Sequence, residues 1–271
     1  MIVDLHCHTT ASDGSLSPAE LVSLARERNI DLLAITDHDT LEAYDALVES
    51  GKPSLITGVE LSCQWHKRGI HLVGLNVNRD SHAMADAMAH QHKARNDRAG
   101  MIAERLEKYG VESPLAGARK EAAGELVGRP HFARYLVACG FVKSEKDAFK
   151  KFLGSGKPCD IKVCWPETRQ VVEWIRGAGG VAVLAHPGKY SFTRSRLISY
   201  LEEFKDCGGQ AIEIYSGPQH PDQTKMYFNL CDQFHLCQSI GSDFHSPAQR
   251  WLNLGVDSDN FRLSRPVWEQ W

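Results

Sequence analysis

Histidine and aspartate side chains stand close together at the start of the chain. The opening stretch "MIVDLHCHTTASDG" contains His6, His8 and Asp13. Alternate side chains of a strand point to the same face, so His6 and His8 project together if "IVDLHCH" forms a strand. Two imidazoles on one face, followed by a carboxylate, indicate part of a metal site.

Later apolar runs carry residues of the same kind at one end: "AITDHD", "LITGVE", "GIHLVG", "AVLAHP" and "SIGSDFH". The ligand candidates in these runs are His38, Glu60, His71, His186, Asp243 and His245. Taken singly, a histidine at a strand end is more often a hydrogen-bonded structural residue, Glu60 could be a surface charge, and "TDHD" could cap a helix. Burying so many ionisable groups together is costly unless cations pair with them, so the repetition favours metal ligation.

The donor set defines the chemistry that these residues could perform. Nitrogen and oxygen donors suit Mn, Fe, Zn or Mg and argue against a thiolate site. The nine candidates are more than one ion accepts, and they match two or three ions that share a bridging carboxylate. Such a multinuclear site activates water and promotes in-line displacement at phosphorus. The sequence therefore predicts phosphoester hydrolysis.

Short strands and helices alternate around these residues. Strands are predicted at residues 1–8, 31–39, 54–65, 69–77, 181–187, 211–217 and 238–245, and helices at 17–29, 40–50 and 170–180. This alternation predicts parallel βα units and an α/β barrel. In parallel barrels the carboxyl ends of the strands form the active-site face, which is where the candidates gather.

The alternation stops between about residues 80 and 165. Residues 81–110 predict one long or two short helices, and polar helical segments follow around 129–153. We therefore predict two domains: a barrel formed by residues 1–79 and 166–271, and a helical insertion formed by residues 80–165 that caps the barrel and binds substrate.

Composition excludes some classes of partner. A net charge of −3 and a pI near 6.5 argue against a broad nucleic-acid surface, although a local cationic pocket for one phosphate is compatible with them. The sequence shows neither a signal peptide nor a membrane span, so we expect a cytoplasmic enzyme without membrane association. The eight cysteines lack CxxC spacing and are expected to be reduced. The remaining histidines are expected on the surface or on helices: His66, His82, His90, His92, His220 and His235.

Together, "DLHCHTTASDG", "AITDHDT", "GVELS", "GIHLVGL", "AHP" and "GSDFH" resemble the polymerase and histidinol phosphatase (PHP) family of the amidohydrolase superfamily. The resemblance implies a distorted, TIM-like (βα)7 barrel with a trinuclear metal centre, usually rich in manganese, although Mg²⁺, Fe or Zn²⁺ could serve. It implies one ion on His6, His8, Glu60 and Asp243, a second on Glu60, His71 and His186, and a third on Asp13, His38 and His245. Catalysis would then rest on His6, His8, Glu60, Asp243 and His245.

The length, the "TTASDG" continuation and the helical insertion are similar to one branch of this family. That branch hydrolyses nucleoside 3′,5′-bisphosphates, and some members remove 5′ nucleotides from short 5′-phosphorylated RNA. The expected substrate is thus a small nucleotide or short RNA, and no protein partner is expected. Two alternatives stay open: a phosphatase for another phosphomonoester such as histidinol phosphate, and a non-catalytic metal-binding regulatory domain.

The insertion should then bind the 5′ phosphate of such a substrate. "GRPHFAR" contributes Arg129, His131 and Arg134, and "GSGKP" contributes Lys157. Arginine matches phosphate oxygens with two parallel hydrogen bonds, and lysine adds a point charge. Arg134 could equally belong to a solvated helix face. Arg129 is the better candidate, because its place before Pro130 predicts a non-helical corner.

Overall fold

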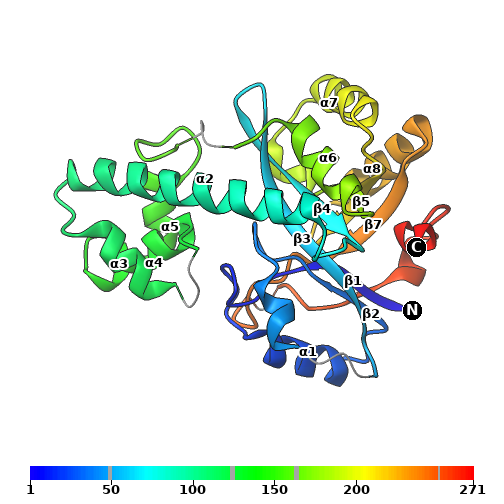
Figure 1. Cartoon of the computed structure of the whole chain (residues 1–271), viewed down its shortest axis with the longest axis horizontal. Coiled ribbons are helices and arrows are strands. Elements are labelled where there is room, and N and C mark those ends of the chain that lie inside the picture. The colour runs from blue at the N-terminus through cyan, green and yellow to red at the C-terminus, as the bar shows by residue number, and fades with distance from the viewer. Residues whose placement is uncertain (48–50, 123–125, 162–164, 250) are drawn as a thin grey trace.

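The fold is a single eight-stranded sheet that curls into a barrel, with helices on its outside and a helical lobe at one side (Figure 1). The computed structural model describes residues 1–47, 51–122, 126–161, 165–249 and 251–271. The strands are β1 (Ile2–Cys7), β2 (Leu32–Ile35), β3 (Ser54–Trp65), β4 (Arg68–Leu75), β5 (Val181–Leu184), β6 (Ala211–Ser216), β7 (Cys237–Gly241) and β8 (Val256–Asp257). Their order in the sheet is β7-β6-β5-β4-β3-β2-β1-β8.

Strands β1 and β7 close the barrel. The Asp243 N–H donates to the His6 carbonyl at 2.7 Å, and the His8 N–H donates to the Phe244 carbonyl at 2.8 Å. All seven strands predicted from the sequence occur in this ring, and the predicted α/β barrel is confirmed. Strand β8, which the sequence did not indicate, pairs with β1 in the antiparallel direction.

The expectation of purely parallel βα units is wrong for β4, which runs antiparallel to both β3 and β5. The physical reason is the length of the connection between β3 and β4. Only His66 and Lys67 join them, with φ of 46° and 61°, and two residues in this conformation make a hairpin rather than a crossover. As a result, His71 near the start of β4 lies opposite Ser62 of β3. It therefore reaches the same edge as the carboxyl ends of the parallel strands.

Four helices pack around the outside of the barrel: α1 (Pro18–Glu27), α6 (Thr168–Gly177), α7 (Arg194–Asp206) and α8 (Pro221–Phe234). Helix α1 begins as its sequence predicts, because the Ser17 hydroxyl accepts from the Glu20 N–H while the Glu20 carboxylate accepts from the Ser17 N–H. Buried aliphatic and aromatic side chains such as Leu61, Ile212 and Phe204 form the core between strands and helices.

The helix expected at residues 40–50 is reduced to one 3₁₀ turn, η1 (Glu42–Ala46), and residues 48–50 lie outside the described part. The buried Tyr44 side chain explains the short turn. Its hydroxyl shares its one proton between the carbonyls of Ile35 and Ile56, at 2.7 and 2.8 Å, and accepts from the N–H groups of Ile35 and Gly58. These contacts hold the turn against β2 and β3.

The insertion is helical and has a hydrophobic core of its own. Its elements are α2 (His82–Glu107), α3 (Pro114–Glu121), α4 (Arg129–Ala138), α5 (Glu145–Ala148) and a π turn, η2 (Phe149–Leu153). Residues 82–107 form one long helix, which reaches from the barrel across the lobe (Figure 1). Leu106, Phe132 and Leu136 are among the fully buried side chains of the second core. This core supports the two predicted domains, whose boundaries at 79/80 and 165/166 stay a prediction.

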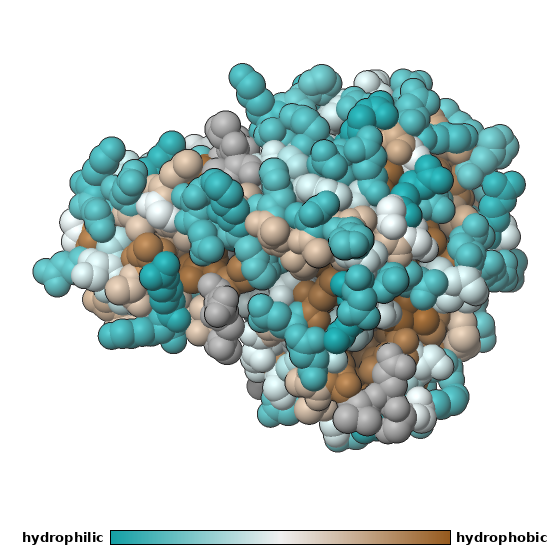
Figure 2. All heavy atoms as spheres, viewed as in Figure 1, coloured by the Kyte–Doolittle hydropathy of each residue, from teal (hydrophilic) through white to brown (hydrophobic). Residues whose placement is uncertain are grey.

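The surface is mainly hydrophilic on the face that Figure 2 shows, over both the barrel and the helical lobe. Among the described residues, no helix is both long and apolar enough to cross a membrane. The described cysteines are free thiols, as expected, and Cys164 lies outside the described part.

Candidate metal centre

The nine ligand candidates meet at one end of the barrel. They come from β1 and the loop after it (His6, His8, Asp13), from the segment after β2 (His38), from β3 and β4 (Glu60, His71), and from the segments after β5 and β7 (His186, Asp243, His245). Two of them sit on unusual backbone, because His186 and Asp243 have φ of 26° and 56°. Such left-handed residues are costly outside glycine and often occur at functional sites, where they turn a side chain toward the centre.

Glu60 is the central carboxylate. Its Oε1 lies 2.8 Å from His71 Nδ1 and 2.7 Å from His186 Nε2. Its Oε2 lies 3.2 Å from His6 Nε2, 3.3 Å from His8 Nε2 and 3.0 Å from His38 Nδ1. Burial alone would raise the pKa of this fully buried carboxyl, but the surrounding imidazoles, His38 foremost, hold the pKa well below its usual range. Glu60 is thus ionised, and imidazole nitrogens lie close to both of its carboxylate oxygens.

Two further carboxylates flank this centre. Asp243 Oδ1 lies 3.6 Å from His6 Nε2 and 3.4 Å from His8 Nε2. Asp13 lies near the other ring nitrogen of His8, with Oδ1 3.9 Å from His8 Nδ1 and 3.3 Å from His245 Nε2. Its Oδ2 lies 3.9 Å from His38 Nε2. Asp243 and Asp13 therefore each approach two or more imidazoles of the cluster.

The side chains form four sets whose donor atoms lie within 4.8 Å of one another. These sets are His8 with Asp13, His38 and His245; His6 with Glu60 and His186; His6 with His8 and Asp243; and His38 with Glu60 and His71. Three of these sets differ in part from the expected ligand groups. His8 joins the Asp13 set, His6 joins Glu60 and His186, and His38 joins Glu60 and His71.

The unsatisfied atoms in these sets fit divalent metal ions. Nitrogens of His6, His8 and His38, and one oxygen of Glu60, are buried without a hydrogen-bond partner. Burial lowers the pKa of His38 to about 4 and that of His186 to about 3, so both imidazoles are neutral at pH 7. Neutral imidazoles and ionised carboxylates are the forms that bind metals, and unpaired buried polar atoms are otherwise costly.

Two further buried acids lie behind the cluster: Glu213 contacts an imidazole, and Asp4 holds the nearby backbone. Glu213 Oε1 lies 3.0 Å from His6 Nδ1, and Glu213 Oε2 accepts from the His186 N–H at 2.6 Å. The buried Asp4 accepts from the N–H groups of Ser242 and Gly255. Burial disfavours the charged form of His6, but Glu213 and Glu60 outweigh it and raise the pKa of His6 to about 10. Outer carboxylates of this kind fix the ring that a metal ligand presents.

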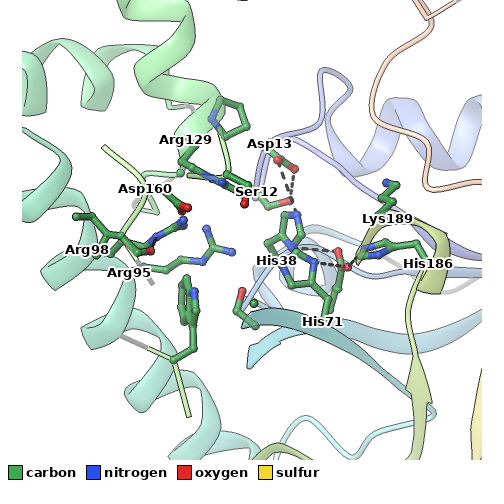
Figure 3. Close-up of a pocket in the computed structure, with 18 of the residues that line it drawn as sticks. Ser12, Asp13, His38, His71, Arg95, Arg98, Arg129, Asp160, His186 and Lys189 are labelled. Carbon is green, nitrogen blue, oxygen red and sulfur yellow. Dashed lines mark hydrogen bonds and ion pairs between the residues drawn. The ribbon is translucent and has the colours of Figure 1, made fainter. Parts of the chain in front are cut away.

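A cavity of about 540 Å³ connects the cluster with the helical insertion. In Figure 3, Arg95, Arg98 and Arg129 lie on one side of His38 and His71. The opposite side carries His186 and Lys189 (Figure 3). The cavity therefore places three guanidinium groups across from the ligand candidates.

Of the predicted phosphate-binding residues, Arg129 and His131 line this cavity. The predicted non-helical corner is wrong, because Arg129 is the first residue of α4. Proline fits the first turn of a helix, so Pro130 does not exclude a helix here. The N–H groups at the start of α4 add positive electrostatic potential to that of Arg129.

The other three predicted positions behave differently. His131 is uncharged at neutral pH, because burial lowers its pKa to about 4, and its Nδ1 accepts from the Gly128 N–H at 2.9 Å. Arg134 does not line the cavity and donates to the Glu121 carbonyl at 3.5 Å. Lys157 is exposed and does not line the cavity either.

Sequence reasoning missed several cavity residues. Arg95 and Arg98 of α2 stand 5.5 and 5.3 Å from the ring centroid of Trp165. Their spacing of three on a helix puts them on one face, and this was the available signal. Lys189 was also missed, although it follows His186 within one short turn, η3 (Pro187–Tyr190), and its ammonium contacts Asp243. None of the six remaining histidines lines this cavity.

Comparison with known proteins agrees with this architecture. A family model of the PHP domain matches residues 4–157. The chain is 42% identical over 270 residues to a 5′-3′ exoribonuclease of Haemophilus influenzae, covering 98% of each protein. It is 37% identical over 273 residues to a 3′,5′-nucleoside bisphosphate phosphatase of Chromobacterium violaceum, covering 99% of this chain and 95% of that protein.

A solved structure has the same fold. An amidohydrolase from Chromobacterium violaceum with bound sulfate matches with a TM-score of 0.88 at 34% identity, over 99% of this chain and 95% of that chain. The metal-ligand pattern, the barrel and these relatives agree, and the chain belongs to the PHP domain family.

Proposed function

We propose that this protein is a metal-dependent phosphoesterase that removes the 3′ phosphate of nucleoside 3′,5′-bisphosphates. On short 5′-phosphorylated RNA, the same reaction would release 5′ nucleotides one at a time. The observation that carries the proposal is the shared cavity, in which Arg95, Arg98 and Arg129 face a cluster of metal-ligand candidates. The names of the relatives, a bisphosphate phosphatase and an exoribonuclease, support it.

The ligand assignment rests on the donor types and their distances. We propose that His6, His8, Glu60 and Asp243 hold one ion, that His71 and His186 share Glu60 to hold a second, and that Asp13, His38 and His245 hold a third. The nitrogen and oxygen donors favour Mn²⁺, with Mg²⁺, Fe or Zn²⁺ as alternatives. Bound ions supply water activation and neutralise charge on the phosphoryl oxygens.

The chain's own residues position the substrate. Arg129 and the first turn of α4 bind the 5′ phosphate, and Arg95 and Arg98 add charge from the neighbouring helix. With this group held, the 3′ phosphorus lies at the cluster, beside the Lys189 ammonium. Water oxygen then bonds to phosphorus, the bond between phosphorus and O3′ breaks, and O3′ takes up a proton. The same bond breaks in a bisphosphate and in RNA.

The two alternative functions account less well for the arginine residues in the cavity. Histidinol phosphate has a single phosphate, so it would offer no second anionic group to Arg129 while that phosphate lay at the cluster. A non-catalytic metal-binding domain would need no phosphate-binding cavity beside its cluster. All nine donors are present, and they converge.

Rates of hydrolysis on matched substrates test the proposal. Adenosine 3′,5′-bisphosphate should be hydrolysed far faster than adenosine 3′-phosphate, and 5′-phosphorylated dinucleotides faster than 5′-hydroxyl ones. The Arg129→Ala variant should lose about 10- to 150-fold in kcat/KM on the 5′-phosphorylated substrates, as expected for one charge-assisted contact. Arg134→Ala, which removes an arginine outside the cavity, is the control. Equal rates with and without the 5′ phosphate would refute the substrate assignment while leaving the metal centre.

A further inference from the structure

The cavity continues beyond the cluster along an aromatic path. The ring centroids of His186 and Tyr190 lie 5.4 Å apart, and those of Tyr190 and Phe192 lie 5.6 Å apart. The Arg68 guanidinium carbon lies 5.8 Å from the Phe192 ring centroid. Arg68, Tyr190 and Phe192 all line the cavity. The path therefore leads from a ligand candidate to an aromatic ring with a guanidinium over it.

Hydrogen bonds and core packing fix the positions of Tyr190 and Phe192 at this end of the cavity. The Tyr190 hydroxyl accepts from the His71 N–H at 2.9 Å and donates to the His71 carbonyl at 3.3 Å. The Phe192 ring packs against Trp65 at 5.7 Å and Tyr200 at 6.3 Å, both of which are buried. Phe192 itself is half-buried and Arg68 is exposed at the β3–β4 hairpin. The ring thus rests on the core and still borders the cavity.

The aromatic path begins at His186, across the cluster from the three arginines Arg95, Arg98 and Arg129 (Figure 3). Arg95, Arg98 and Arg129 come from the insertion, whereas His186 and Lys189, which begin the aromatic path, lie across His38 and His71 from them (Figure 3). A substrate whose 5′ phosphate is bound by the arginines and whose 3′ phosphorus lies at the cluster would extend toward the path. In RNA, the group attached there is the O5′ of the second nucleotide.

We propose that Phe192 and Arg68 form a subsite for the nucleotide that follows the scissile phosphate in 5′-phosphorylated RNA. This inference rests on the proposed function. The second base stacks on Phe192, and Arg68 contacts the next phosphate along the strand. Aromatic rings bind bases of any sequence by stacking, and arginine adds an ionic contact to the backbone. Adenosine 3′,5′-bisphosphate has no group for this subsite.

Hydrolysis by the whole protein of the substrates pAp, pApA and pApApA tests the subsite. Phe192→Leu keeps an apolar side chain in the same packing but removes the ring face. It should lower kcat/KM for pApA and pApApA by about 5-fold or more, the lower range for one lost base stack, and leave pAp within about twofold. Arg68→Ala should lower kcat/KM about 5-fold or more for pApApA only, because pApA lacks the next phosphate.

The Lys67→Ala variant is the matched control, since it removes a neighbouring hairpin charge that does not line the cavity. It should leave all three substrates unchanged. A Phe192→Leu variant that loses activity equally on pAp and pApA, or on neither, overturns the subsite. Wild-type protein that hydrolyses pAp but not pApA also overturns it and leaves the phosphatase standing. Wild-type protein inactive on pAp refutes the proposed function itself.

Discussion

Arg95 of α2 donates from Nε to Asp39 Oδ2 at 2.7 Å, and its Nη2 lies 2.7 Å from the same oxygen. The pair joins the helical insertion to the loop after β2, one residue beyond His38. Asp39 is fully buried and also accepts from the N–H and hydroxyl of Ser62. The ion pair therefore links Arg95 of the insertion to the loop that carries the ligand candidate His38.

Breaking this pair from one side should destabilise the protein. Arg95→Ala leaves a buried carboxylate without its cation, and we expect a loss of about 3–5 kcal/mol in the free energy of unfolding. Arg95→Met combined with Asp39→Asn should recover much of this loss, because no buried charge is left. Urea unfolding of the two variants measures the difference. A double variant as unstable as Arg95→Ala would show that the charge itself is not the cause.

Glu60→Gln should remove more metal than His71→Ala. The carboxylate faces imidazoles with both oxygens, whereas His71 contributes one nitrogen. We expect Glu60→Gln to lose more than one ion per chain and nearly all activity. Metal analysis of proteins loaded under the same conditions checks this. Equal metal loss and equal residual activity in both variants would remove Glu60 from the bridging role.

Chelation should abolish activity and leave the fold intact. Large clusters of buried hydrophobic side chains hold both the barrel and the insertion together, and their packing does not require a bound ion. Without metal, a protonated His6 still balances part of the charge of Glu60 and Glu213. The helical circular dichroism signal should persist after chelation, with a lower Tm because the bound ions no longer stabilise the native state. A lost helical signal would mean that the centre is structural.

Gly241→Ala should disturb the centre through His6. A Cβ on Gly241 would lie 2.5 Å from the His6 Cβ and 2.8 Å from its backbone nitrogen, so one strand would have to move. We expect a cost of about 1–3 kcal/mol in stability and reduced metal content. Gly100→Ala is the control, since nothing lies within 4 Å of its added Cβ and alanine should strengthen α2 by about 0.5–1 kcal/mol. Normal metal binding by Gly241→Ala would contradict the prediction.

His131 should make stability depend on pH in a mildly acidic range. Burial lowers its pKa to about 4 in the folded protein, against about 6.5 in an unfolded chain. As the pH falls, the unfolded chain binds the proton first. Above about pH 6.5 the neutral His131 therefore costs the protein no stability. The free energy of unfolding decreases as the pH falls from there to about 4, because the unfolded chain alone binds the proton. Unfolding free energies of wild type and His131→Gln across this range should differ in slope, and parallel curves would refute the assignment.

The sequence by itself determined where the barrel strands lie and which side chains are the candidate metal ligands. Period-two and apolar runs are local properties, so they located the seven barrel strands and showed that His6 and His8 share a face. The start of the helix predicted from residue 17 is also a local property, and α1 begins at Pro18. Because the carboxyl ends of parallel strands meet at one edge, donors at those ends could be grouped without coordinates.

Only the tertiary structure decided which cations face the donors. Helical spacing shows that Arg95 and Arg98 share a face of α2, but the docking of the insertion on the barrel decides that this face meets the cavity and Trp165. The same docking leaves Lys157 exposed outside it. These contacts join residues far apart in the chain, and they depend on side-chain packing between two cores. A sequence pattern describes which residues share a face and does not describe what that face meets.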